Sequence, residues 1–496
     1  MAVTPFAEYA PDKPPLGQWT RYVQNVLPET LDSYAPVYEL AETGTSLSAT
    51  CQGAAAFRST ADGTAVNFAG DAADLYLSNN SFTWAEVTRS SGGAYATASD
   101  GRWIFEQFNN SVVATNGVDV MQEWSIGAST NFVNMNSTSA STDASPIARY
   151  VATVRDFLFA GHLSTNKAGI RWSEQFNHRS WRTGTNQSDS QDLPDNGEVT
   201  GIVGGQYGVV FQQHAINLLT YTGIADIVFQ RDLVSDDMGT MAPGSISSIE
   251  QTIFFYGTRG FCRIENGQSV QPIGIQRVDK TFADDVNITY LNRIASAIDQ
   301  VNKLYYVAYP SNASTMGTPD KMLVYNFGID RWALLNFGAD VLWNMYASTG
   351  LTLENLDALY PDLDAMEVSL DSPIFQSSPI KTFAAFTSNK KLAFFEGTAL
   401  DAVIDTIEAE TNPFGQAEID RIIPYIDGGT IACLLGRRNR LNDTMTFSAQ
   451  SSQDSFGDIY FREPPARFHR ARVLWTPGDG THAQGIEFAA NKAGDR

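Results

Sequence analysis

Few residues in this 496-residue chain have the types and spacing that metal or acid–base chemistry requires. No two histidines lie four residues apart, the spacing that brings two imidazoles to one face of a helix to bind zinc, and none has the neighbouring glutamate of a metalloprotease. The five histidines are His162, His178, His214, His469 and His482. We expect them to be packed or surface residues, and we predict no metal site and no cofactor.

A group of carboxylates raises the possibility of a calcium site, because Ca²⁺ binds several hard oxygen ligands from a flexible loop. The group comprises Asp357, Asp362, Asp364, Glu367 and Asp371. No EF-hand and no glycine-rich calcium repeat accompanies them. We favour a solvated loop or helix caps for these residues, with calcium binding as the alternative.

No motif in the sequence predicts an enzyme. Glycoside hydrolysis requires two carboxylates placed on either side of a sugar, and nothing singles out a pair among 55 acidic residues. SNNSFTW at 78–84 resembles the turn motif of sialidase blades, but Asn80 and Phe82 stand where Asp and Gly are expected. GIVGGQYG at 201–208 lacks the Lys-Ser/Thr ending of a phosphate loop. We therefore predict no catalytic or cofactor-binding residue.

The cysteines and the apolar segments indicate a protein made in a reducing compartment. Cys51, Cys262 and Cys433 are odd in number and far apart, so we expect small buried apolar residues rather than disulfides. The N-terminal stretch lacks a basic start followed by an apolar run, and no run approaches the roughly 18 residues that span a bilayer. These features predict a soluble chain synthesised in the cytoplasm, without a cleaved signal or membrane insertion.

The charge is strongly acidic and unevenly distributed. The chain has 33 Lys and Arg against 55 Asp and Glu, a net charge of −22, which opposes sequence-independent binding to nucleic-acid phosphates. Residues 421–496 hold ten basic and eight acidic residues (+2), which leaves 23 against 47 (−24) for the rest. GRRNR at 436–440 and RFHRARVLW at 467–475 form the basic cluster. On a strand, Arg470 and Arg472 would share one face, either solvated or docked to an acidic partner.

One sequence pattern recurs along the chain. A short run of aromatic or β-branched residues is followed by Gly, Asn or Asp and then by another such run. This pattern is typical of antiparallel hairpins. In 53–88, for example, Asp62-Gly63 suits a tight turn that requires positive φ. Comparable units cover 95–125, 148–182, 199–223, 245–274, 295–338 and 382–397, and Trp84, Trp124, Trp172 and Trp332 lie near the last strand of their units.

Units of about 35 to 55 residues with several short strands each are typical of β-propeller blades, which bury their faces only by stacking in a ring. We predict an all-β protein: a β-propeller of antiparallel blades, with the blade number open by one or two, an additional C-terminal β domain and an extended N-terminal leader. The expected bounds are 1–45 for the leader or docking segment, 46–410 for the propeller with an acidic insertion near 351–378, and 411–496 for the C-terminal domain.

The leader is rich in proline, which keeps a segment extended and short of backbone donors. Its prolines include Pro5, Pro11, Pro14 and Pro15, and its apolar anchors are Trp19, Tyr22 and Val26. Two roles explain these residues equally well. The leader either docks to another protein or straps across its own C-terminal domain.

Several strings spread over nearly the whole chain are distinctive. They are WTRYVQNVLP, RYVATVRDFLFAG, WRTGTNQSDSQDLPDNGEVTGIVGGQYGVVFQQHAI, DRWALL, LDSPIF, LAFFEG and RFHRARVLWTPGDGTHAQGIEFAA. Together they resemble tail hub, or nozzle, proteins of short-tailed bacteriophages and their prophages, a family also described as packaged-DNA stabilisation proteins. The stretch 181–216 is the most specific, because it joins an unusual polar run to a glycine-rich strand.

The resemblance implies a structural virion protein, not an enzyme, located in the virion tail after synthesis in the host bacterial cytoplasm. It implies a homohexameric ring below the phage adaptor (head-to-tail connector) protein, with fibres or a plug as further tail partners. Such a ring retains the packaged genome and conducts the DNA on ejection, without sequence-specific binding. The alternatives are a propeller tail protein that binds or cleaves host-surface glycans, and a non-viral propeller scaffold.

Overall fold

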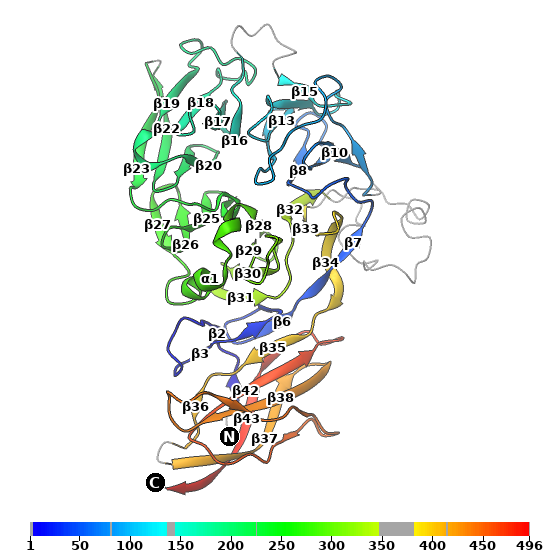
Figure 1. The fold of residues 1–496 in the computed structure, drawn as a ribbon, viewed down its shortest axis with the longest axis vertical. Coiled ribbons are helices and arrows are strands. Elements are labelled where there is room, and N and C mark those ends of the chain that lie inside the picture. The colour runs from blue at the N-terminus through cyan, green and yellow to red at the C-terminus, as the bar shows by residue number, and fades with distance from the viewer. Residues whose placement is uncertain are drawn as a thin grey trace.

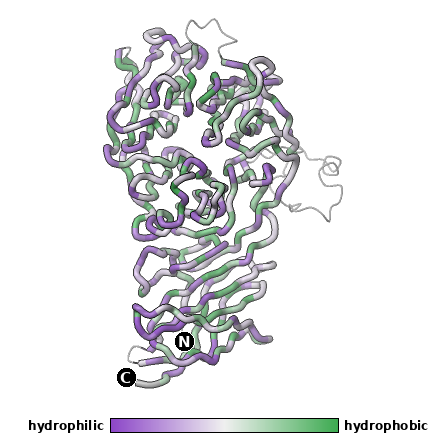
Figure 2. The backbone as a smooth tube through the Cα atoms, viewed as in Figure 1, coloured by the Kyte–Doolittle hydropathy of each residue, from purple (hydrophilic) through white to green (hydrophobic). Residues whose placement is uncertain are grey.

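The fold comes from a computed structural model, which describes residues 3–79, 82–135, 144–224, 226–346, 381–412 and 415–495. A ring of small sheets occupies one end of the molecule, and an elongated β domain occupies the other (Figure 1). Hydrophobic and hydrophilic stretches alternate along the chain in both parts (Figure 2). The acidic insertion near 351–378, with the five carboxylates considered for calcium, lies outside the described residues.

Within the described residues, the ring consists of seven four-stranded antiparallel sheets. The first three sheets are β8 (Gly53–Arg58), β9 (Ala65–Gly70), β10 (Leu75–Ser78) and β11 (Trp84–Glu86); β12 (Ile104–Phe108), β13 (Ser111–Thr115), β14 (Gln122–Ser125) and β15 (Val133–Asn134); and β16 (Ala148–Val154), β17 (Phe157–Leu163), β18 (Gly169–Trp172) and β19 (Asp189–Asp192). The fourth is β20 (Val199–Val203), β21 (Gly208–Gln212), β22 (Ile216–Ile224) and β23 (Ile227–Ser235).

The remaining sheets complete the ring. The fifth and sixth are β24 (Ser247–Ile249), β25 (Thr252–Gly257), β26 (Gly260–Glu265) and β27 (Ser269–Pro272), then β28 (Ala295–Asp299), β29 (Leu304–Tyr309), β30 (Lys321–Asn326) and β31 (Arg331–Leu335). The seventh joins β32 (Val341–Tyr346), β33 (Lys381–Phe386) and β34 (Leu392–Ala399) to β7 (Tyr38–Thr43) from the leader. Because β32 contacts β8 of the first sheet, the ring closes.

The predicted β-propeller is therefore confirmed, and the ring has seven blades within the described residues. At six of the seven junctions between neighbouring blades the first strands contact one another, so these strands are the inner ones. Side chains of adjacent blades share one core: Phe68 of the first blade lies 5.3 Å from Trp124 and 5.1 Å from Phe132 of the second, between ring centroids. At the predicted Asp62-Gly63 turn, Gly63 has φ +77°, a conformation that favours glycine.

The β domain consists of two sheets. One has the order β41 (Ile459–Tyr460), β37 (Gly415–Ile426), β43 (Ala483–Asp495), β6 (Tyr34–Pro36) and β5 (Val26–Pro28), with β1 (Thr4–Pro5) on β43. The other has the order β39 (Thr446–Phe447), β38 (Thr430–Arg438), β42 (Phe468–Thr476), β35 (Ala402–Asp405) and β4 (Val23–Gln24), with β36 (Ala409–Glu410) on β42 and β40 (Ser451–Ser452) on β38. A short parallel pair, β2 (Glu8–Tyr9) and β3 (Trp19–Thr20), completes the leader.

Domain bounds differ from the expected ones at both junctions. The leader is not a separate segment over 1–45, because its last strand β7 completes the seventh blade and β1, β4, β5 and β6 join the β domain. The propeller does not extend to 410, because β35 and β36 pair with β42. Short strands gain stability only from neighbours, and the neighbours here come from the opposite end of the chain.

Helices are few in the described residues. They are α1 (Asp279–Asp285) and the 3₁₀ turns η2 (Pro194–Asn196), η3 (Pro243–Ser245) and η4 (Ile288–Arg293). Within the same part of the chain, no helix has the length and apolar character that spanning a bilayer requires.

Candidate functional site

The most distinctive feature is the joint between the propeller and the β domain, which the chain crosses twice. One crossing leads from β6 into β7, and the other leads from β34 into β35. The two crossings lie side by side, because β7 pairs with β34 and β4 pairs with β35 (Figure 1). Two adjacent connections restrict hinge motion between domains more than the usual single linker does.

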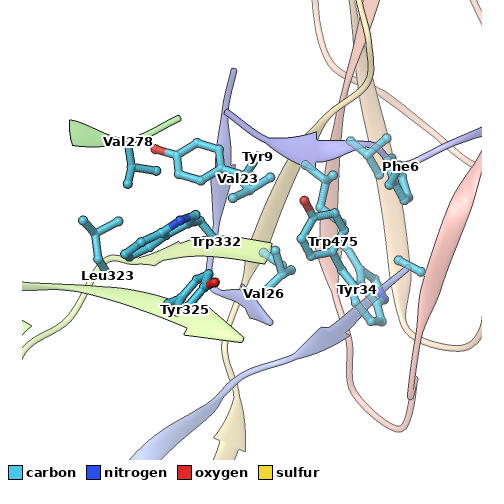
Figure 3. Close-up of a cluster of buried hydrophobic side chains, with 14 of the residues drawn as sticks. Phe6, Tyr9, Val23, Val26, Tyr34, Val278, Leu323, Tyr325, Trp332 and Trp475 are labelled. Carbon is cyan, nitrogen blue, oxygen red and sulfur yellow. The ribbon is translucent and has the colours of Figure 1, made fainter. Parts of the chain in front are cut away.

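A single hydrophobic core runs through this joint. Trp332 and Tyr325 of the sixth blade belong to the same buried cluster as Val23 and Val26 of the leader and Trp475 of β42 (Figure 3). The rings of Tyr325 and Trp332 lie 4.7 Å apart, and the Trp332 indole N–H donates to the Ile273 carbonyl at 3.1 Å. Because both domains bury side chains in this core, each stabilises the other.

Asn25 connects three distant segments at the centre of the joint. Its backbone N–H donates to the carbonyl of Leu334 at 3.0 Å. Its side-chain amide donates to the Asp401 carbonyl at 3.0 Å and accepts from the Asn336 N–H at 2.8 Å. Asn25 is 7% exposed and has φ +56°, a left-handed conformation that asparagine tolerates. Asn25 was not predicted from the sequence as a functional residue, although an asparagine between two buried valines, Val23 and Val26, is a usable signal of a backbone irregularity.

The three apolar residues expected to anchor the leader, Trp19, Tyr22 and Val26, all make contacts within this chain. Val26 is fully buried. The Trp19 indole donates to the Pro14 carbonyl at 2.7 Å, and Lys13 Nζ lies 4.9 Å from the centroid of its ring. The Tyr22 hydroxyl donates to Gln24 at 2.7 Å. The Trp19 and Tyr22 bonds lie within the leader itself. Contact with the C-terminal domain comes from the pairing of β1 with β43 and of β4 with β35 and from Val26 in the shared core, which corresponds to the strap, one of the two roles considered.

The arginines of the basic strand are paired within the β domain. Asp405 is fully buried; it accepts from Arg472 Nε at 2.7 Å and Nη2 at 3.0 Å, and Arg470 Nε lies 3.3 Å away. The Arg472 guanidinium also lies 4.6 Å from the centroid of the Tyr22 ring and 4.7 Å from that of Phe447. Arg470 and Arg472 therefore form neither a fully solvated face nor a free basic docking surface.

Other arginines of the basic cluster are paired in the same way. Arg437 contacts Glu463 at 3.0 Å. Arg438 contacts Glu408, and Arg467 contacts Glu410, each at 2.5 Å. Asp405, Glu408 and Glu410 all lie in or between β35 and β36, the first strands of the β domain after the propeller, so the basic cluster anchors these strands to β38 and β42.

A charged cluster fixes the second blade to the loop after β18. Glu123 of β14 accepts from His178 Nε2 at 2.9 Å and from Arg179 Nε at 2.8 Å, and its side chain is 1% exposed. Burial alone would raise the pKa of Glu123, but the hydrogen bonds from His178 and Arg179 outweigh burial and lower this pKa to about 2. The carboxylate therefore stays ionised, as a structural ion pair requires.

His469 and the three cysteines do not contribute to a common site. His469 is buried, Thr411 contacts its Nδ1 at 2.8 Å, and burial lowers its pKa to about 4. Across the described ranges, no three His, Cys, Asp or Glu side chains are grouped as a metal site requires. Cys51, Cys262 and Cys433 are buried free thiols, and burial raises the pKa of each to about 12.

A cavity of about 830 Å³ opens beside the joint. Leu27 and Val37 of the leader line it together with Tyr306, Phe383 and Phe395 of the last two blades. The Tyr306 and Phe383 rings stack at 4.7 Å, and those of Phe383 and Phe395 stack at 5.2 Å, between centroids. The cavity thus has an aromatic wall, with polar groups that include Asp299 and Glu396.

No protein-family model and no curated protein matches the sequence. Solved structures that resemble the fold include a chain of the mitotic checkpoint complex (8% identity, TM-score 0.34, 73% of this chain and 96% of that one). The structure of YCF48 bound to D1 peptide is 12% identical, with a TM-score of 0.34, and the match covers 75% of this chain and 94% of that one. PorZ of Porphyromonas gingivalis is 8% identical, with a TM-score of 0.34, and the match covers 77% of this chain and 44% of PorZ. These similarities carry no functional argument.

Proposed function

We propose that this chain is a structural virion protein of a short-tailed phage that forms the tail nozzle ring below the adaptor. The ring would retain the packaged genome and conduct the DNA on ejection. The sequence resemblance, spread over nearly the whole chain, suggests this role. The observation that carries the proposal is the joint, where two chain crossings and one buried core tie the propeller to the β domain.

A nozzle subunit has to transmit load between the end attached to the adaptor and the distal end of the tail. Domains linked by one flexible segment move relative to each other by default. Here both termini belong to the β domain, with β1 and β43 paired, and the propeller is inserted between them. A force that separates the domains must therefore disrupt the shared core and the hydrogen bonds of Asn25 to Leu334 and Asn336 together, as a channel wall under pressure requires.

The charge distribution supports conduction of DNA without adhesion. Six copies would carry 6 × −22 = −132 formal charges. The arginines of the basic C-terminal cluster that form ion pairs, Arg437, Arg438, Arg467, Arg470 and Arg472, are engaged by carboxylates of the same chain. Arginines paired in this way are less available to release counterions from phosphates, and a like-charged wall resists binding of DNA.

Electron microscopy of particles from the producing culture, labelled with an antibody against this protein, tests the proposal. We expect label at the distal end of a short tail and a six-fold ring in averaged images. The absence of label from every particle would contradict a virion role. The control is the same antibody after adsorption with the purified protein.

A second candidate function is binding or cleavage of host-surface glycans by a tail protein. The aromatic wall of Tyr306, Phe383 and Phe395, with Asp299 and Glu396 in the same lining, favours it, because sugar rings stack on aromatic faces and cleavage requires two carboxylates. Label on lateral appendages, together with sugar release from host polysaccharide, would support this candidate. Glu396→Gln and Phe383→Ala variants should then lose release and binding, respectively.

A further inference from the structure

The starts of the inner strands meet around the axis of the propeller. Consecutive blades run in the same direction around the ring, so the residues that precede or begin β8, β12, β16, β20, β24, β28 and β32 gather on one face. Two adjoining cavities occupy this place, one of about 520 Å³ and one of about 210 Å³. Arg102 and Asn292 line both cavities, so the two cavities share a wall.

Two guanidinium groups line the larger cavity. Arg102 donates from Nη1 to the Asp340 carbonyl and from Nη2 to the Arg293 carbonyl, each at 2.9 Å, which fixes its position between blades. Arg149 donates from Nη2 to the Asp100 carbonyl at 2.9 Å. These three bonds go to neutral carbonyl oxygens. Arg149 also forms one long ion pair, in which its Nη2 lies 4.0 Å from the exposed carboxylate of Asp100.

The larger cavity has one acidic residue in its lining, Glu106. The Glu106 carboxyl accepts from the backbone N–H of Thr153 at 3.0 Å. Burial raises its pKa to about 7, and the hydrogen bonds from Thr153 oppose this rise only in part. At neutral pH a large share of this carboxyl is therefore protonated. Within its own lining, the larger cavity has two guanidinium groups and this one carboxyl, and the Asp340 carboxyl of the adjoining cavity also attracts Arg102.

The rest of the wall suits a small organic molecule. Ile104, Ile202 and Ile246 supply apolar surface, and Asn292 supplies an amide. Thr200 also belongs to the lining; it is 7% exposed, and its hydroxyl has no hydrogen-bond partner within the described part of the chain. Ligand sites typically combine such an apolar wall with a few polar groups in a volume of this order.

We propose that the larger axial cavity binds a small organic anion, held through its carboxylate or phosphate oxygens by Arg102 and Arg149. Guanidinium groups present paired donors that match two oxygens of such an anion, and they remain charged when partly buried. The volume accommodates a molecule of sugar-acid or sugar-phosphate size. This site is independent of the nozzle proposal, because it requires neither a ring nor a virion.

The test measures binding of inorganic phosphate, citrate and glucuronate to the purified full chain by calorimetry, with chloride at matched ionic strength as the salt control. We expect at least one of these anions to bind saturably at one site per chain. Arg149→Gln should weaken binding about tenfold or more, since a charge-assisted hydrogen bond is lost. Arg259→Gln is the matched control, because Arg259 has a 65% exposed side chain and lies outside both cavities.

Two results would overturn the proposal: no saturable binding of any of the three anions, or equal affinity in Arg149→Gln and the unaltered chain. Arg102→Gln is a poorer probe, because it also removes donors from two backbone carbonyls. If Arg149→Gln does not fold, Arg149→Lys replaces it. The lysine variant keeps the charge but loses the paired donors, and it should bind each anion more weakly than the unaltered chain.

Discussion

Asn25 provides the sharpest test of the joint at the scale of a single residue. Asn25→Ala removes both side-chain hydrogen bonds and leaves the Asn336 N–H and the Asp401 carbonyl without these partners. It also places a residue with a Cβ and no local hydrogen bond at φ +56°. We expect the free energy of unfolding to fall by about 2 to 4 kcal/mol, measured by urea denaturation.

Asn266→Ala is the matched control, because Asn266 also has a positive φ, +53°, but is exposed. It should show the backbone effect alone, of about 1 kcal/mol. Asn25→Gly separates the two effects, since glycine accepts the backbone conformation but cannot form the side-chain bonds. Equal losses in Asn25→Ala and Asn266→Ala would show that the side-chain bonds of Asn25 do not stabilise the joint.

Glu106 predicts a pH dependence of stability. Burial raises its folded-state pKa to about 7 from an ordinary value of 4.5. The folded chain thus retains a proton that the unfolded chain releases, so this contribution is complete below about pH 4.5 and is lost as the pH rises to about 7. Glu106→Gln should flatten the fall in unfolding free energy over this interval by up to about 3 kcal/mol. Parallel curves of melting temperature against pH for the two proteins would contradict this.

At the scale of elements, the leader strands hold the propeller and the β domain together by packing in the core that both share. Val26 at the start of β5 is fully buried in the shared core, whereas Leu31 in the same leader is 54% exposed. Val26→Asp should lower the unfolding free energy by several kcal/mol, because it buries a charge without a partner. Leu31→Asp should stay within about 0.5 kcal/mol. Chemical denaturation of both variants checks this, and similar losses would mean that β5 packs loosely.

Elements with local pairing could be predicted from the sequence, and those with distant pairing could not. The unit at 53–88 matches the first blade because its strands are neighbours joined by short turns such as Asp62-Gly63. The fourth strand of the seventh blade was missed, since β7 lies more than 300 residues before β34. Leader strands of two or three residues are too short to show the alternation of apolar and polar residues by which a strand is predicted.

The charged groups of the candidate sites show the same limit. Alternation at 470–473 predicts a strand with arginines on one face, and β42 is that strand. Its partner Asp405 could not be predicted, because nothing local distinguishes one carboxylate among 55. Arg102 and Arg149 likewise lie at the starts of separate blades. Only closure of the ring brings them into one cavity.

At the scale of the whole molecule, the shared core predicts cooperative unfolding. Chains with several domains usually unfold in several steps. Here one buried cluster includes residues of two blades, the leader and both sheets of the β domain. We expect a single calorimetric transition whose van't Hoff enthalpy approaches the calorimetric enthalpy. Two separated transitions would show that the joint does not couple the domains.

The pairing of β1 with β43 also has a consequence for biosynthesis. Thr4 lies opposite Ile486, so during synthesis β1 waits for a partner strand that lies more than 480 residues later in the chain. At roughly 5 to 20 residues per second, this wait is on the order of half a minute or more. The first six blades pair locally and are able to form on the nascent chain, whereas the sheet that holds β1, β6 and β37 is complete only once β43 has been made. A translation product that ends before β43 therefore leaves β1 without its partner strand, and such an unpaired strand edge is prone to pair with other chains.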